Sequence, residues 1–243
     1  MCYRGSLSVQ TIENEVMVKG WDTSKKPKIT SFNFNAFSNP KINIIAQDNP
    51  GEVSDATWGL VPSWGSKDPK QFLSKNQYTN NARGEEMYEK KSYKNFIDNG
   101  RCLILFDGFY EPHAYDKKNK QTYYCYIANG EKMEDRKIMA IGGIYSKIAN
   151  EYYVSLVTTE ANEFFSIVHN EKKRMPLVLA EDLSREWIEK NQTPNIIKQL
   201  VIEGVTKEQF NAHPISSDIN KRDFHRDSPE VIEPVEAFEN IFA

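Results

Sequence analysis

The chain has 243 residues, of which 39% are hydrophobic and 12% aromatic, so it can bury a substantial core and is not a disordered protein. No apolar run reaches the roughly 18 residues that a bilayer-spanning helix needs. The net charge of −3 and isoelectric point of about 5.9 argue against a protein that coats nucleic acid, although they allow a local basic cleft that holds a few phosphates.

The cysteines and the amino terminus indicate the compartment. The 3 cysteines, at positions 2, 102 and 125, suit neither a disulfide framework nor a zinc site, so we expect reduced thiols. The first residues lack the charged-then-apolar pattern of a signal peptide. We therefore expect a cytoplasmic protein.

The first hundred residues predict short elements separated by polar loops. Val9, Ile12 and Val16 follow Ser8 at helical spacing, which predicts a short helix. Residues 22–40 are rich in lysine, serine, asparagine and proline, which predicts a long loop. The other elements predicted here are the strands Ile42–Ala46 and Ala56–Leu60, separated by a turn at Asp48–Gly51, and the helix Glu85–Ile97.

The second half is dominated by apolar segments rich in aromatic and β-branched residues. They predict the strands Cys102–Phe106, Tyr123–Ile127, Ile138–Ile144, Tyr153–Thr158 and Pro176–Leu179, with helices at Glu160–Val168 and Glu181–Glu189. Strands and helices do not alternate strictly, which favours a β-rich α+β fold. We expect a single domain over residues 1–243, with mixed and antiparallel sheets that form a barrel-like core flanked by short helices.

Cys2 is the first candidate for chemistry. If Met1 is removed, which a small second residue permits, the mature chain begins with both an α-amine and a thiol on one residue. The α-amine has a reference pKa of about 7.7–8.0, so roughly a tenth of it is unprotonated at neutral pH. Such an amine attacks aldehydes, and the adjacent thiol can then close a five-membered thiazolidine ring. The alternative is an ordinary residue at a frayed terminus.

Two motifs in the middle of the chain suit contacts with nucleic acid. Trp58 and Trp64 offer aromatic faces on which unpaired bases can stack, unless they pack into the core. Asn81 can orient a small polar group and Arg83 can clamp a phosphate. The alternative for this second pair is a helix cap and a surface salt bridge.

Two further residues are candidates for proton transfer. Glu111 follows the apolar segment 102–106 among aromatic residues, and partial desolvation there would raise its pKa, unless it is a solvated edge carboxylate. His169 closes the helix predicted over residues 160–168, where it can be a general acid or base or simply a favourable cap.

Together these motifs resemble the SRAP family (SOS response-associated peptidase), whose members are also called abasic-site processing proteins. The matching motifs occur in the family's order and span about residues 1 to 235. They are Met1-Cys2-x-Arg4, Trp58-Gly59-Leu60-Val61-Pro62-x-Trp64, Asn81-Ala82-Arg83, Gly108-Phe109-Tyr110-Glu111, Val168-His169, Arg174-Met175-Pro176-Leu177-Val178-Leu179 and His213-Pro214-Ile215-Ser216.

The resemblance implies a role for each candidate. Cys2, freed of Met1, would form a thiazolidine with the aldehyde of an abasic site, and Asn81 would bind the reacting sugar or the terminal cysteine. Glu111 would transfer protons, and His169 would help to open the sugar ring and to reverse the adduct. The residues implied in DNA binding are Arg4, Trp58, Trp64, Arg83 and Arg174.

The resemblance also implies partners and class. The partner is single-stranded DNA with an abasic site, no membrane is involved, and the protein acts as a monomer. Neither a metal nor another cofactor is implied. The family's peptidase activity would at minimum remove the chain's own Met1, with autocleavage as one route, beside a lyase-type activity on the lesion.

The chain departs from the family's pattern at several places. Position 3 is Tyr3 where the family usually has glycine, which crowds the turn after the nucleophile. The segment Asn170–Lys173 is longer than the common form. Residues 22–40 depart from the usual Asn-x-x-Pro pattern, for which Asn35 and Pro40 are only loose candidates.

Two alternatives to this function stay open. An amino-terminal-nucleophile amidohydrolase also exposes a cysteine at position 2, but such enzymes usually continue Cys-Gly-Ile, whereas this chain continues Cys2-Tyr3-Arg4. A non-catalytic reader of single-stranded DNA would use the tryptophans and arginines alone and would leave Cys2, Glu111 and His169 unexplained.

Overall fold

Five strands close into a barrel in the computed structural model, which describes residues 2–15, 29–130, 135–221 and 223–242. The barrel order is β10-β4-β3-β6-β9, and β9 pairs with β10 to close it. Neighbouring barrel strands are antiparallel except β4 and β10, which are parallel. Their bounds are β3 Lys41–Ala46, β4 Asn49–Trp58, β6 Arg101–Phe106, β9 Met139–Ile148 and β10 Glu151–Glu160.

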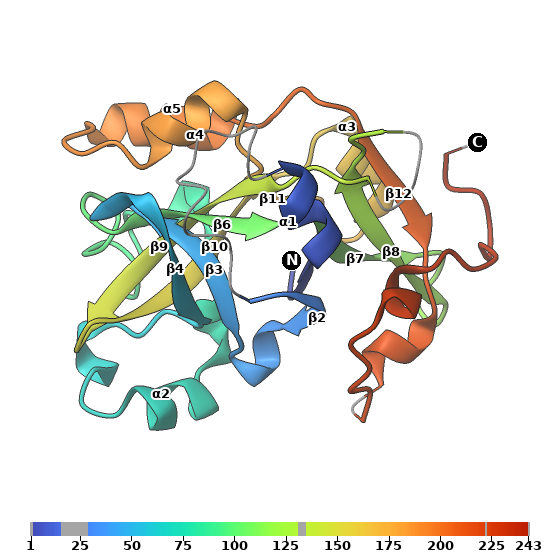
Figure 1. Cartoon of the computed structure of the whole chain (residues 1–243), viewed down its shortest axis with the longest axis horizontal. Coiled ribbons are helices and arrows are strands. Elements are labelled where there is room, and N and C mark those ends of the chain that lie inside the picture. The colour runs from blue at the N-terminus through green and yellow to red at the C-terminus, as the bar shows by residue number, and fades with distance from the viewer. Residues whose placement is uncertain (1, 16–28, 131–134, 222, 243) are drawn as a thin grey trace.

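A second, antiparallel sheet lies beside the barrel, and the chain's first described residues lie between the two (Figure 1). Its order is β12-β8-β7-β1-β2. Asp107 alone separates β6 from β7, so the chain passes directly from the barrel into this sheet. The bounds are β1 Arg4–Leu7, β2 Ser31–Asn35, β7 Gly108–Ala114, β8 Lys120–Ile127 and β12 Phe210–Pro214.

Short helices and two short strands complete the fold. The strands β5 Asn81–Arg83 and β11 Arg174–Pro176 extend the sheet along β10. Among the described residues, no helix is long and apolar enough to cross a membrane. The α-helices are α1 Val9–Glu15, α2 Pro69–Lys75, α3 Glu163–Val168, α4 Glu181–Trp187 and α5 Pro194–Glu203, and the 3₁₀ turns are η1 Ala36–Ser38, η2 Ser63–Gly65, η3 Gln77–Asn80, η4 Gly84–Glu86, η5 Ser217–Asn220 and η6 Pro229–Ile232.

The predicted α+β fold with a barrel core is confirmed. The strands predicted between residues 102 and 158 correspond to β6, β8, β9 and β10, and the two before them to β3 and β4. The helices predicted after Ser8, before His169 and from Glu181 appear as α1, α3 and α4, although Val16 lies outside the described residues.

The helix predicted over Glu85–Ile97 is wrong. After η4 this segment is a series of turns in which Met87, Tyr93 and Ile97 are buried one at a time. Tyr93 donates a hydrogen bond from its hydroxyl to the Asn81 carbonyl at 2.9 Å, which ties one turn to β5. The polar residues between the buried ones leave no continuous apolar face on which a helix could pack.

The prediction of an uninterrupted loop over residues 22–40 is wrong for its described part, residues 29–40. Ser31–Asn35 forms β2, whose alternating Phe32 and Phe34 are a strand signal within a polar segment. Asn35 then caps η1 by accepting a hydrogen bond from Phe37 N. The predicted turn is also shorter, because β4 begins at Asn49 rather than at Ala56.

Candidate functional site

Cys2 and Tyr3 lead into β1 and lie against β7. Strands β1 and β7 pair antiparallel, with Gly5 opposite Phe109. If this register is continued by two residues, Tyr3 lies opposite Glu111. Cys2 is fully buried, and its thiol donates a hydrogen bond to the Arg4 carbonyl at 3.2 Å. Strand pairing therefore brings the candidate nucleophile and the candidate proton-transfer carboxyl together.

His169 ends α3 and lies against Glu111. Its Nδ1 is 3.3 Å from Glu111 Oε2 and 2.9 Å from the Arg174 carbonyl oxygen. A carbonyl oxygen can only accept, so in the neutral ring Nδ1 carries the proton and Nε2 carries the lone pair. Three residues that lie far apart in the sequence, Cys2, Glu111 and His169, thus meet in one buried place.

Polar contacts between α3 and β7 hold His169 in this position. The His113 ring donates from Nδ1 to the Ile167 carbonyl at 2.8 Å. The Asn170 side chain makes two hydrogen bonds to the backbone of Ala114. Its Nδ2 donates to the Ala114 carbonyl oxygen at 2.8 Å, and its Oδ1 accepts from Ala114 N at 3.1 Å. In the sequence Asn170 is only part of a longer loop, because the spacing of residues along the chain does not show that its amide meets β7.

Burial sets the protonation states in the site. It raises the pKa of Glu111 to about 7, which leaves this carboxyl able to give or take a proton at neutral pH. Burial lowers the pKa of His169 to about 4, so the imidazole is neutral there. Burial, with the charge of Glu111 adding to it, raises the pKa of the Cys2 thiol far above its usual range. The thiol is therefore protonated until a base removes its proton.

Asn81 presents a buried amide toward the site. β5 pairs with β10, and the Asn81 residue is 8% exposed. Neither its Oδ1 nor its Nδ2 makes a hydrogen bond of normal geometry to any residue that the structure describes. Burial raises the pKa of Tyr3, and the Asn81 side chain partly offsets that rise, so the two side chains are neighbours. A buried amide with so few hydrogen bonds can bind a polar group of a ligand.

Asp107, which the sequence did not single out, anchors the amino-terminal segment. It accepts hydrogen bonds from the hydroxyls of Ser6 and Thr11 and from Ser8 N, and it forms a buried ion pair with Arg136 at 3.2 Å. Burial alone would raise the pKa of Asp107, but Arg136 and these donors hold it below its usual value. This network fixes β1 and the start of α1, and with them the position of Cys2.

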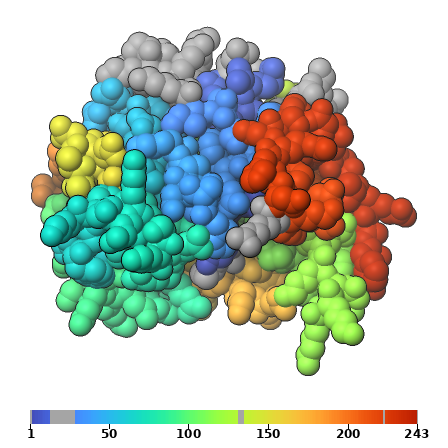
Figure 2. Space-filling model, turned by 90° about the horizontal axis from the view of Figure 1, so that it is seen from below, coloured from blue at the N-terminus to red at the C-terminus, as the bar shows by residue number. Residues whose placement is uncertain are grey.

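Arg4 lies at the wall of a cleft of about 530 Å³ that opens beside the start of β1. Its guanidinium donates to Asn33 Oδ1, and burial lowers its pKa. Figure 2 looks at this face, where η1 (blue) lies beside the carboxy-terminal segment (red). Of the arginines predicted to hold phosphates, Arg4 is the one that borders this cleft.

The two tryptophans have different environments. Trp58 is fully buried, packs against Phe106 with ring centroids 5.5 Å apart, and donates from its indole to the Asn80 carbonyl. The base-stacking role predicted for Trp58 is therefore corrected to a core role. Trp64 lies in η2 and is 56% exposed, as stacking requires.

The two remaining arginines also differ. Arg174 is buried and makes a bidentate pair with Glu85, both bonds being 2.8 Å, while Nη2 also donates to the Thr158 carbonyl. Its predicted phosphate contact is corrected, because these bonds occupy both Nη atoms of its guanidinium and tie β11 to the turn at η4. Arg83 is exposed and its one ion pair among the described residues, to Glu86, lies at the surface. Such a pair yields readily to a phosphate.

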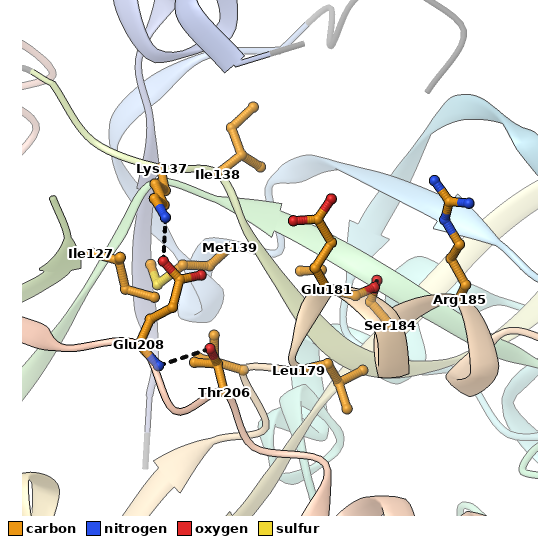
Figure 3. Close-up of a pocket in the computed structure, with 12 residues that line it drawn as sticks. Ile127, Lys137, Ile138, Met139, Leu179, Glu181, Ser184, Arg185, Thr206 and Glu208 are labelled. Atoms are coloured by element: carbon orange, nitrogen blue, oxygen red, sulfur yellow. Dashed lines mark hydrogen bonds and ion pairs between the residues drawn. The ribbon is translucent and has the colours of Figure 1, made fainter. Parts of the chain in front are cut away.

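A second hollow lies elsewhere, between β9 and α4 (Figure 3). At about 20 Å³ it has room for one water. Lys137 and Glu208 pair across it, and Glu208 N donates to Thr206 Oγ1. Among the described residues, no group of three histidine, cysteine or acidic side chains could hold a metal ion.

Comparison with known proteins gives a family match over most of the chain. A family model described as SOS response associated peptidase (SRAP) matches residues 1–222. The chain is 32% identical over 190 residues to the abasic site processing protein YoaM of Bacillus subtilis, covering 74% of this chain and 77% of that protein. It is 31% identical over 205 residues to the abasic site processing protein HMCES of Gallus gallus, covering 76% of this chain and 58% of that protein.

The fold also matches a solved structure. A crystal structure of a protein from Bacteroides thetaiotaomicron superposes with a TM-score of 0.77, covering 97% of this chain and all (100%) of the other. The sequence identity is 23%, so the likeness supports the fold and not a function.

Proposed function

Because this chain belongs to the SOS response-associated peptidase (SRAP) family, we propose that it processes abasic sites in single-stranded DNA through a covalent bond to Cys2. Such an adduct would shield the lesion during the response to DNA damage. The observation that carries the proposal is the buried Glu111, whose pKa is raised to about 7, beside Cys2 and His169. One copy of the chain supplies all of these groups.

The reaction begins when Met1 is removed and the α-amine of Cys2 becomes free. Cys2 is fully buried, and hydrolysis of the Met1–Cys2 peptide bond turns its amide nitrogen into a free amine. Hydrolysis of this one peptide bond is the peptidase activity that the proposal requires. The free amine is the first nucleophile because the neighbouring thiol is held in its protonated form.

Imine formation follows. The amine adds to the C1′ aldehyde of the opened sugar to give a carbinolamine, which loses one water to form an imine. Glu111 takes a proton from the attacking nitrogen and returns it to the departing hydroxyl. A carboxyl whose pKa lies near neutrality can do both.

Ring closure completes the adduct. The Cys2 sulfur adds to the imine carbon, its proton passes to Glu111, and the imine nitrogen gains a proton to become the ring amine of a thiazolidine. No oxidant or second reactant is needed. Because sulfur and imine belong to one residue, the step is intramolecular and strongly favoured.

The remaining residues act on the sugar and on the strand. His169, neutral and with its lone pair on Nε2, takes the hemiacetal proton when the sugar ring opens and assists the reverse reaction. Asn81 offers its buried amide to a sugar hydroxyl. Arg4 and Arg83 hold phosphates, and Trp64 supports a base.

The test is a denaturing gel of purified protein mixed with single-stranded DNA that carries one abasic site. We expect a slow-migrating adduct that is lost in Cys2→Ala and is weak on intact DNA. Cys102→Ala is the matched control, since Cys102 is a buried thiol of the barrel strand β6, and it keeps the adduct. An unshifted band from protein shown to lack Met1 would refute the proposal. Hydrolysis of an amide substrate without an adduct would favour the amidohydrolase instead.

A further inference from the structure

The cleft at the start of β1 is lined by residues from distant parts of the chain. The amino-terminal part supplies Tyr3, Asn35 and Phe37, the carboxy-terminal part supplies Lys221 and Phe224, and β7 and β8 contribute residues between them. Its volume, about 530 Å³, falls within the range of about 300–1,000 Å³ that is usual for small-molecule sites. Cys2 itself is buried and does not line the cleft, but Tyr3 does, so the cleft begins one residue along the chain from the reacting residue.

One wall is a pair of stacked aromatic rings. The rings of Tyr3 and Phe37 lie with centroids 4.7 Å apart and an interplanar angle of 24°. Phe37, in η1, is 47% exposed although it is a large apolar side chain. Tyr3 is half-buried, so the pair offers its exposed surface through Phe37, and an aromatic wall of this kind suits a planar, partly apolar ligand.

The charge of the cleft selects the ligand further. Acidic residues outnumber basic ones in the chain, 34 to 31, yet none of the described residues that line the cleft is acidic. Arg4 and Lys221 both border it. Lys221 pairs at the surface with Asp218 at 2.7 Å, and such an exposed pair yields readily to a phosphate. The Arg4 guanidinium is oriented by the neutral side chain of Asn33 rather than by a carboxylate, so its charge stays available to an anion.

We propose that this cleft holds the nucleotide next to the abasic site, with its base stacked on the Tyr3–Phe37 pair and its phosphate between Arg4 and Lys221. The inference deepens the proposed function and rests on it for the identity of the strand. A planar base with an adjoining phosphate is the ligand that matches an aromatic wall, two cations and no acid.

The stacked pair explains the departure at position 3. Glycine, the usual residue of the family there, offers no ring to Phe37, so the aromatic wall depends on the tyrosine of this chain. A base that lies on this wall has left its own stack and its pairing partner. The cleft therefore favours single strands over duplexes, because in a duplex that neighbouring base is held by its complement.

The experiment measures binding and adduct formation separately. The binding probe is a fluorescent single strand with one tetrahydrofuran site, which lacks the aldehyde and cannot react. It is compared with strands in which the base on the 5′ or the 3′ side of that site is also removed. The same set with a true abasic site gives the rate of adduct formation at limiting protein. The proteins are wild type, Tyr3→Leu, Tyr3→Phe and Phe37→Leu, each with its midpoint of thermal unfolding.

For wild type we expect that removing one of the two neighbouring bases weakens binding about 5- to 150-fold, the usual contribution of one stacked base. Tyr3→Leu and Phe37→Leu should bind the complete strand correspondingly more weakly and should no longer respond to base removal. Tyr3→Phe keeps the ring and should retain the wild-type dependence of binding on the neighbouring base. Phe→Leu and Tyr→Leu preserve apolar bulk, so unchanged unfolding midpoints exclude a folding defect.

Two results would overturn the inference. One is wild-type binding that is indifferent to both neighbouring bases, and the other is a base dependence that survives in Tyr3→Leu. Failure of the proposed function looks different: the tetrahydrofuran strands would show the base dependence while the true abasic strands gave no adduct.

Discussion

Replacing Glu111 by glutamine should make the protein more stable at alkaline pH while it slows the reaction. Glu111 is fully buried, and burial raises its pKa from 4.5 to about 7. A carboxyl whose pKa is raised on folding contributes stability below its unfolded pKa and loses that stability as pH rises through the folded value. Glutamine is isosteric and does not ionise, so the loss should disappear.

The size of the effect follows from the same shift. The difference between 4.5 and about 7 corresponds to about 3 kcal/mol at a pH above both values, as an order of magnitude. At pH 8 the variant should therefore be more stable than wild type by up to about 3 kcal/mol. At pH 4 the two should differ little, since the carboxyl is protonated in both the folded and the unfolded protein.

Urea unfolding at pH 4, 6 and 8 measures this difference directly, and the adduct assay at pH 7 measures the catalytic cost. Loss of a general acid and base typically slows a reaction by about 10²- to 10⁴-fold. Glu111→Asp is the control, because it keeps an ionisable group but shifts its position. Equal stability differences at all three pH values would refute the assigned pKa, and an unchanged adduct rate would refute the catalytic role.

Four other substitutions test the surroundings of the site. Asp107→Asn leaves Arg136 buried without its countercharge and should lower the free energy of unfolding in urea by about 3–5 kcal/mol. This advantage of the wild type should shrink as pH falls through the lowered pKa of Asp107. An equally stable variant would contradict the anchoring role. Asn170→Ala removes the two hydrogen bonds to Ala114 of β7. It should slow adduct formation and shift the pH profile of the rate, with little change in DNA affinity. A change in DNA affinity alone would instead place Asn170 in DNA binding. Trp58→Ala should lower the free energy of unfolding by about 3–5 kcal/mol, because Trp58 is fully buried. Trp64→Ala should change it by less than about 0.5 kcal/mol and should weaken DNA binding, because Trp64 is exposed. The reverse pattern would exchange the roles of the two residues.

The barrel could be predicted from the sequence because its strands carry their own signal. Cys102–Phe106 and Tyr153–Thr158 are mostly apolar and buried throughout, which is how strands of a closed sheet appear. The second sheet was harder. β7 contains Pro112 and β2 sits in a polar segment, so tertiary pairing rather than local preference makes them strands.

The candidate reacting residues of the site could be predicted from the sequence, but the residues that hold them in position could not. Cys2, Glu111 and His169 each belong to a residue type that acts on protons or aldehydes, and motif order related them. Asp107 and Asn170 act by meeting partners that lie far away in the sequence, and spacing carries no information about such contacts. For Trp58 the sequence left two alternatives open, stacking on a base and packing in the core, and its full burial decides for the core.

The mass of the intact adduct tests the central claim most directly. The protein is incubated with an abasic single strand, and the complex is measured by mass spectrometry and then digested to find the modified residue. The predicted mass is that of the chain without Met1 plus the strand minus one water, with the modification on Cys2. An adduct that retains Met1, or one attached to a lysine, would contradict the account.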